Sequence, residues 1–146
     1  GTAVIKSSTG EPIIAVIDVT NRSAGLGNMY NGGLESDAST EAYVPAHYYL
    51  AGGSTAGTIA MNIDSTPTTI TYEYYDRNTQ SLTTSEDQSN VGQYIAFAKN
   101  TKKVSGLTAG WAGAVKAKSS TASRIIVVAN ITQSGKSAFF SAFPKK

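Results

Sequence analysis

Cysteine is absent from the 146-residue sequence, and histidine occurs once, at His47. Without a thiol the chain has no disulfide scaffold, no thiolate zinc site and no cysteine nucleophile. With a single imidazole it also lacks the ligands of a histidine-rich metal site. We therefore expect no metal or other cofactor, and we interpret His47 as a structural or partly exposed side chain.

Charge and long apolar runs are scarce too. The net charge is +2, with 15% charged residues, which gives no electrostatic reason to expect a nucleic acid or an anionic membrane as partner. No apolar run approaches the roughly 20 residues of a membrane-spanning helix, so we predict no membrane insertion of this segment. Since the sequence begins at Gly1 with neither an initiator methionine nor a signal-peptide pattern, we expect a processed or trimmed chain.

Catalytic patterns are missing as well. The many serines are not accompanied by a nucleophile elbow. The stretch Asp76-Arg77-Asn78 lacks the closing glutamate of a calcium loop and is better explained as a turn. Without these catalytic patterns, carboxylate side chains are the remaining candidates for catalysis, and we predict that the protein is not an enzyme.

What the sequence does contain is typical of short strands joined by polar turns. Eight tyrosines, 14 glycines and many Val, Ile, Ser and Thr residues are present. The cleanest alternation is at residues 68–75, where Ile70, Tyr72 and Tyr74 share one face. Similar short segments recur along the chain without a convincing helix. We predict a single all-β domain over residues 1–146, an antiparallel β-sandwich, immunoglobulin-like or related, with about eight to ten strands.

One stretch of the sequence occurs twice. Residues 113–132, GAVKAKSSTASRIIVVANIT, match residues 1–20, GTAVIKSSTGEPIIAVIDVT, without gaps at an offset of 112. The identical pairs are Gly1/Gly113, Lys6/Lys118, Ser7/Ser119, Ser8/Ser120, Thr9/Thr121, Ile13/Ile125, Ile14/Ile126, Val16/Val128 and Thr20/Thr132. We predict that each copy is a hairpin whose second strand is strongly apolar.

Two explanations of this duplication stay open at this point. One is that the chain is a window from a tandem array. The other is that one copy completes the sheet of this subunit while the other engages a neighbouring subunit. An exposed apolar strand such as residues 13–19 is an aggregation hazard unless it is paired. Pairing it with the sheet edge of another copy would build a filament from head-to-tail contacts.

The second explanation predicts a homopolymer and a subunit interface. Its residues come from the two apolar strands and from the aromatic strand that follows the second copy: Ile13, Ile14, Val16, Val19, Ile125, Ile126, Val127, Val128, Phe139 and Phe140, with Phe143 as further cover.

A binding function is the alternative. The aromatic residues Tyr30, Tyr48, Tyr49 and Trp111 are candidates for a sugar-stacking platform that would bind surface glycans. Asn21 and Asn130 begin Asn-x-Ser/Thr patterns and are candidate glycosylation sites. Residues 21–40, which follow the first copy of the repeat, are dense in turn formers, and we expect a long surface loop there.

Several of these segments resemble a known class of domain. Thr58–Asp76, TIAMNIDSTPTTITYEYYD, has a strand–turn–strand pattern with a Ser/Thr/Pro turn, and residues 1–20 and 113–132 have small residues, a turn and an apolar strand. Together they cover about half of the chain. They resemble tandem immunoglobulin-like or related β-sandwich repeats of bacterial and archaeal surface proteins, although the loop at residues 21–40 departs from that pattern.

This resemblance implies a stalk, adhesin or fibre subunit at the cell surface. We therefore expect a structural subunit of an extracellular filament or surface array, assembling head to tail by β-strand complementation between subunits. The alternative is a carbohydrate-binding or adhesion module of a secreted multi-repeat protein.

Overall fold

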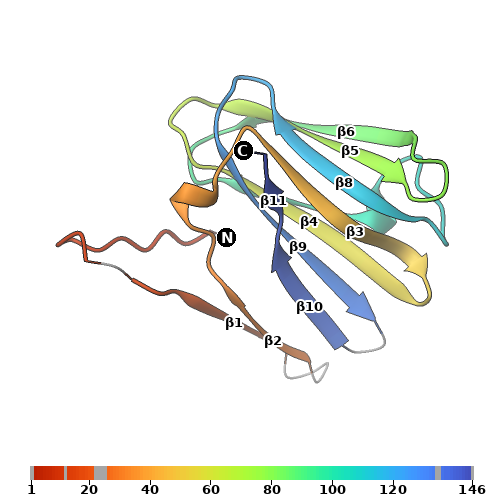
Figure 1. Ribbon diagram of the computed structural model, residues 1–146, viewed down its shortest axis with the longest axis horizontal. Coiled ribbons are helices and arrows are strands. Elements are labelled where there is room, and N and C mark those ends of the chain that lie inside the picture. The colour runs from red at the N-terminus through yellow and green to blue at the C-terminus, as the bar shows by residue number, and fades with distance from the viewer. Residues whose placement is uncertain (1, 12, 22–25, 134–135, 146) are drawn as a thin grey trace.

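The computed structural model describes residues 2–11, 13–21, 26–133 and 136–145, with side chains left out for residues 17–31. Two short 3-10 turns, η2 (Glu35–Asp37) and η3 (Thr101–Lys103), are the only helical elements in these ranges (Figure 1). The strands are β1 (Val16–Asn21), β2 (Leu26–Asn31), β3 (Glu41–Ala51), β4 (Ser54–Asn62), β5 (Thr68–Asp76), β6 (Leu82–Val91), β7 (Ala96–Asn100), β8 (Ala112–Ser119), β9 (Ile125–Gln133), β10 (Lys136–Ser141) and β11 (Phe143–Pro144).

Nine of these strands form one antiparallel sheet. The order is β10-β9-β4-β3-β8-β5-β6, with β11 paired to β3 and β7 paired to β4. This arrangement confirms the predicted all-β antiparallel class. Strand β3 pairs with β8 along most of its length but with β4 only near the hairpin at Tyr49–Ala51. The sheet therefore turns back on itself at this hairpin, and we call residues 33–145, which contain it, the body.

The core lies between the two halves of the turned sheet. Ile70, Tyr72 and Tyr74 of β5 are fully buried, so the alternation predicted for residues 68–75 is confirmed. They pack in one cluster with Val115 of β8 and with Val127 of β9, which belongs to the opposite half. The Tyr72 hydroxyl donates a hydrogen bond to the carbonyl of Phe97 on β7 at 3.1 Å, which ties the two halves together across the core.

His47 is part of this core. Its ring lies 6.3 Å from the ring of Tyr74, and its Nε2 lies 3.4 Å from the Thr58 hydroxyl. Burial lowers the pKa of His47 to about 4, so the ring is neutral at ordinary pH. The structure thus places His47 among core side chains, as a structural histidine.

The remaining strands, β1 and β2, form a separate antiparallel hairpin. We call residues 2–32, which contain it, the arm; Figure 1 shows the arm running outside the sheet of the body. The long loop predicted at residues 21–40 is wrong in part, because β2 occupies Leu26–Asn31. Paired backbone formed there despite the turn-forming composition.

Candidate functional site

The second copy of the repeat contains two interior strands of the body. Strand β8 lies between β3 and β5, and β9 lies between β4 and β10. The hairpin predicted for residues 113–132 is therefore wrong, because β8 and β9 do not pair with each other. Residues 120–124 instead carry the chain from one half of the sheet to the other. Both edges of β8 and of β9 are occupied by neighbours within the same chain.

Hydrogen bonds hold this crossing in place. The Ser119 hydroxyl donates to the Ser123 carbonyl at 2.6 Å, and the Ser123 hydroxyl donates to the Thr66 carbonyl at 3.2 Å. The backbone N–H of Arg124 donates to Asp64 at 2.7 Å, and the Arg124 guanidinium pairs with the same carboxylate at 2.8 Å. These bonds from Arg124 lower the pKa of Asp64. The second copy is thus anchored at its turn as well as along its strands.

The apolar residues of the second copy split between two faces. Ile125 and Val127 are buried in the core, whereas Ile126 and Val128 are half-buried on the outer face. The backbone of residue 33 covers Ile126 closely, since a Cβ added to Gly33 would lie 2.6 Å from the Ile126 Cγ2. Two of the predicted interface residues, Ile125 and Val127, are therefore core residues of this chain.

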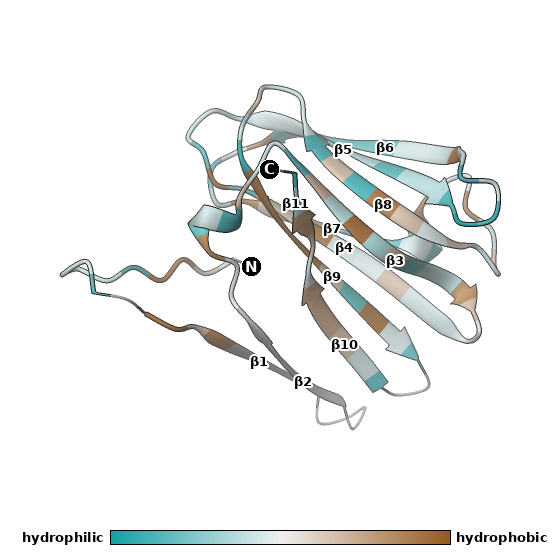
Figure 2. Ribbon diagram, viewed as in Figure 1, coloured by the Kyte–Doolittle hydropathy of each residue, from teal (hydrophilic) through white to brown (hydrophobic). Residues whose placement is uncertain are grey.

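The first copy is exposed. Ile13, Ile14 and Val16 are 44%, 93% and 60% exposed, and Ile125, the counterpart of Ile13, is 1% exposed. Figure 2 shows the hydrophobic colour of the stretch that leads into β1, outside the body. The predicted interface residue Val19 lies in β1, but its side chain is outside the described set.

In the described part of the first copy, Lys6 and Thr2 form hydrogen bonds to the body. No strand lies between residues 2 and 11 or at residues 13–15, so the hairpin predicted within residues 1–20 is wrong for the part described. The Lys6 ammonium donates to the Tyr94 hydroxyl at 3.3 Å and lies 5.5 Å from the centre of that ring. The hydroxyl of Thr2 donates to the Tyr94 carbonyl. Neither contact covers the exposed isoleucines.

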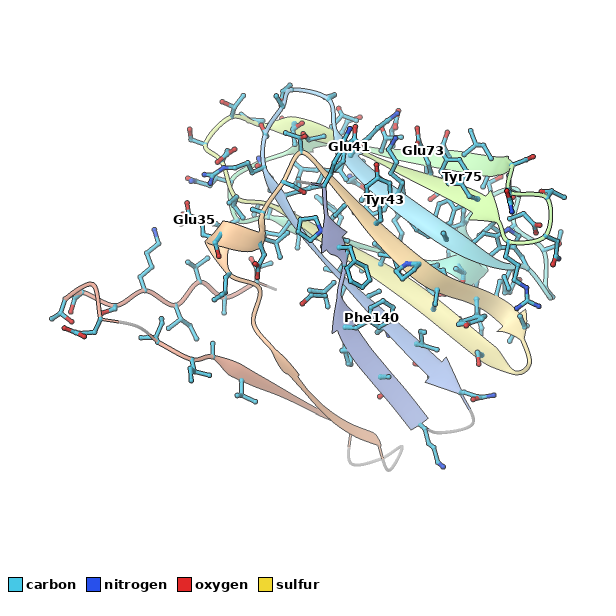
Figure 3. All side chains as sticks on the ribbon, in the orientation of Figure 1. Glu35, Glu41, Tyr43, Glu73, Tyr75 and Phe140 are labelled. Carbon is cyan, nitrogen blue, oxygen red and sulfur yellow. The ribbon has the colours of Figure 1, made fainter. Side chains whose placement is uncertain are left out.

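The aromatic strand after the second copy lies at the edge of the sheet. Phe140 of β10 is half-buried and packs against the core cluster (Figure 3). Phe139 is half-buried too. Phe143 of β11 pairs with Tyr43 of β3, and its side chain is 63% exposed. Of the predicted aromatic cover, Phe143 is thus the side chain that is most open to solvent.

A ladder of charges covers the outer face of β3, β8 and β5 (Figure 3). Lys116 lies 3.4 Å from Glu73 and 3.9 Å from Glu41, and Lys118 also pairs with Glu73. A hydrogen bond from Tyr43 lowers the pKa of Glu41. Partial burial opposes ionisation of Glu73, but its bonds from Lys118 and other donors outweigh burial and lower its pKa. Every carboxylate here is ionised and paired, which suits a structural ladder better than acid–base catalysis.

Three residues of the predicted aromatic platform, Trp111, Tyr48 and Tyr49, are buried or half-buried. Trp111 is only 7% exposed, stacks edge-on against Tyr74 with ring centres 6.1 Å apart, and donates its N–H to the Thr83 hydroxyl. Tyr49 packs against the core cluster, and Tyr48 is half-buried. The side chain of Tyr30 lies outside the described set. Trp111 therefore belongs to the core cluster instead of a surface platform.

A shallow recess of about 340 Å³ lies on the outer face of β4 and β9. Asn130 and Thr132 both line it, since residues two apart on a strand share a face. The candidate glycosylation pattern at Asn130 thus faces outward, whereas the side chain of Asn21 is outside the described set. Glycosylation at either asparagine stays a prediction.

The described residues contain no group of three or more His, Asp or Glu side chains arranged to hold a metal ion. They also contain no helix with the length and apolar character needed to cross a membrane.

Comparisons with known proteins bear on the fold alone. No protein-family model matches the sequence, and no curated protein matches it. The structure is similar to the crystal structure of Thermotoga maritima 1070, with a TM-score of 0.60 and 10% sequence identity. The similarity covers 75% of this chain and 97% of that chain. At this identity the likeness shows a shared β fold and carries no activity over to this chain.

Proposed function

We propose that this protein is a non-enzymatic structural subunit of an extracellular filament or surface array, in which copies follow one another head to tail. Each copy contributes strands to the next, so the first copy of the repeat is the joining element. The observation that carries the proposal is the contrast between Ile13, which is 44% exposed, and its counterpart Ile125, which is 1% exposed.

The energy of apolar burial supports this role. Burying an isoleucine or valine side chain stabilises a protein by about 1.5–3 kcal/mol relative to leaving it in water. The arm leaves Ile13, Ile14 and Val16 largely in water, and contiguous exposed apolar residues mark interaction sites. A neighbouring copy that covers these three side chains would gain several kcal/mol.

The polar surface of the body fits a structural role as well. Its carboxylates on the outer face of β3, β8 and β5 are paired with lysines, and its histidine is enclosed in the core. A body whose outer carboxylates are paired, joined to an arm whose Ile13, Ile14 and Val16 are exposed, is suited to repetition. The absence of cysteine does not argue against a location outside the cell, because a full-sized core needs no disulfide.

Immuno-electron microscopy of cells that produce the protein tests this function. Antibodies against the body should label filaments or an ordered lattice outside the cell, with repeated label along each filament. Label confined to the cytoplasm, or to dispersed secreted molecules without any order, would contradict the proposal. An antibody against an unrelated cytoplasmic protein of the same cells gives the matched control for leakage.

A further inference from the structure

We infer that the arm is a second set of the strands β8, β9 and β10, built to complete the strands β3 to β7 of another copy of this fold. This inference rests on the proposed function and deepens it, since it assigns the joining element a definite place. The sequence repeat alone covers residues 1–20. Three features of the backbone extend the correspondence between the arm and the second copy from residue 20 to residue 32.

The first feature is the turn inside the repeat. Gly10 has φ +78° and Ala122, at the same position of the second copy, has φ +58°. Both lie in the left-handed region, which is uncommon for a residue with a side chain. The chain therefore makes the same unusual turn in both copies, once against the body and once in solvent.

The second feature is the hairpin that follows. Strands β1 and β2 pair antiparallel with Thr20 opposite Gly27, and β9 and β10 pair antiparallel with Thr132 opposite Ser137. Thr20 and Thr132 are counterparts in the repeat. Six residues separate the first pair and four the second. The two hairpins thus have the same register, with two extra residues in the turn of the arm.

The third feature is the way in which the chain leaves each hairpin. The N–H of Gly32 donates to the carbonyl of Ala15 at 3.0 Å, and the N–H of Ala142 donates to the carbonyl of Val127 at 2.9 Å. Ala15 and Val127 are counterparts at the offset of 112. Gly32 and Ala142 are counterparts once the two extra turn residues are counted. The same bond therefore ends both segments.

The composition of the arm matches the place that it would fill. Five apolar residues of the second copy are buried in the body, and each has an apolar counterpart in the arm: Ala3, Ile5, Ile13, Ala15 and Ile17 for Val115, Ala117, Ile125, Val127 and Ala129. The correspondence continues past the end of the sequence repeat. In the arm, Met29 and Tyr30 lie opposite β1, and at the equivalent positions of the body Phe139 and Phe140 lie opposite β9. The large residues at the hairpin thus recur without sequence identity.

The partner follows from the topology of the body. In this chain the places between β3 and β5 and beside β4 are filled by its own β8 and β9. The arm therefore fits a unit made of residues 33–112, which carries β3 to β7 without β8 and β9, whereas a complete copy of this chain has those places filled. The size of one closed unit agrees: the similarity to Thermotoga maritima 1070 spans three quarters of 146 residues, about 110, close to the 112-residue offset.

An extended chain tests the assignment. Residues 33–112 are fused in front of Gly1 of the full chain, so that Ala112 precedes Gly1 as it precedes Gly113 in the native sequence. Hydrogen exchange measured by mass spectrometry should show the amides of residues 13–20 protected like those of residues 125–132. In the unextended chain the same amides should exchange on the order of a hundredfold faster, because no neighbouring sheet covers β1.

Matched substitutions in the extended chain separate the two units. Ile13→Asp should abolish protection of residues 13–20 and leave residues 125–132 protected, and Ile125→Asp should do the reverse. Equal exchange of residues 13–20 in the extended and unextended chains, with residues 125–132 still protected, would overturn the assignment. This outcome would leave the surface label described above unaffected, so the place of the arm and the proposed function can fail separately.

Discussion

The two copies of the repeat share nine identical residue pairs but lie in opposite surroundings. In the body, Ile125 is enclosed between the two halves of the sheet, and both strands of that copy have neighbours on each side. In the arm, the equivalent residue Ile13 is 44% exposed, and no strand precedes Val16 in the described part. The comparison shows that the repeated segment does not contain the strands with which it pairs. It becomes a pair of interior strands only where β3, β4 and β5 are present to receive it.

The largest expected contrast is between Ile125→Ala and Ile13→Ala. Truncating Ile125 leaves a cavity in the core and should lower the free energy of unfolding of the body by about 2–5 kcal/mol. Truncating Ile13 should change it by less than about 0.5 kcal/mol, because the side chain is 44% exposed and lies outside the core cluster. Urea unfolding followed by Trp111 fluorescence measures both. Equal losses in the two variants would mean that the arm is part of the core of this chain.

Acid should lower the stability of the body where the second copy begins. His47 pairs with Gly113 at the start of the repeat, and its pKa is lowered to about 4 by burial. Between pH 6.5 and 4 the unfolded chain binds a proton that the folded chain excludes, so stability is full above pH 6.5 and falls as the pH drops to 4. The loss should reach about 3 kcal/mol.

The matched control for this pH effect is His47→Leu. The variant should lose the dependence between pH 6.5 and 4 that the wild type shows, whatever its stability at neutral pH. Chemical unfolding at pH 7, 5.5 and 4 gives the comparison. A variant with the same slope as the wild type would assign the acid sensitivity to other groups.

A smaller, stabilising effect is expected from Ala122→Gly. Ala122 adopts a left-handed φ of +58°, which costs a residue with a Cβ roughly 1–2 kcal/mol, while glycine adopts it freely. After the greater entropy of glycine in the unfolded chain is subtracted, the body should gain about 0.5 kcal/mol. The arm already has glycine at this position, as Gly10. Thermal unfolding measures the shift, and a lower midpoint would contradict it.

The smallest contrast concerns the identical lysines. Lys118 pairs with Glu73 on the charge ladder, and Lys118→Met should cost about 0.5 kcal/mol, less at high salt. Lys6→Met should leave the unfolding of the body unchanged, because Lys6 contacts the ring of Tyr94 rather than a carboxylate. Urea unfolding at 50 mM and 1 M NaCl compares the two variants. A loss in Lys6→Met as large as that in Lys118→Met would show that the arm supports the body.

The fold class could be predicted from the sequence because β5 has a clean period of two, with Ile70, Tyr72 and Tyr74 all facing inward. Strand β6 was harder to predict. Its segment Ser85–Asn90 is polar and looks like a loop, but it forms a strand since its backbone pairs with β5 while most of its side chains face solvent. Trp111 was misplaced for a related reason: flanking glycines do not reveal whether a side chain fills the core.

The candidate site was predicted in part. The repeat itself is visible in the sequence, and so are its apolar residues. Whether Ser119 to Arg124 closes a hairpin or crosses between the halves of a sheet depends on what lies beside each strand, and that is set by β3, β4 and β5, which are distant in sequence. The extension of the repeat into β2 and β10 is recorded only in the register, because Met29-Tyr30 and Phe139-Phe140 share no identical residue.

The pairing of β11 with the beginning of β3 has a mechanical consequence. Phe143 lies opposite Tyr43, and the N–H of Lys145 donates to the carbonyl of Glu41 at 2.9 Å, so the chain reaches the body and leaves it at the same end. Tension along a row of such units would pass between two adjacent antiparallel strand ends and bypass the core. It would peel the β11 pairs apart one after another instead of shearing them together. The force would act at one end of each body, and β11 would separate from β3 before the core strands carried any load.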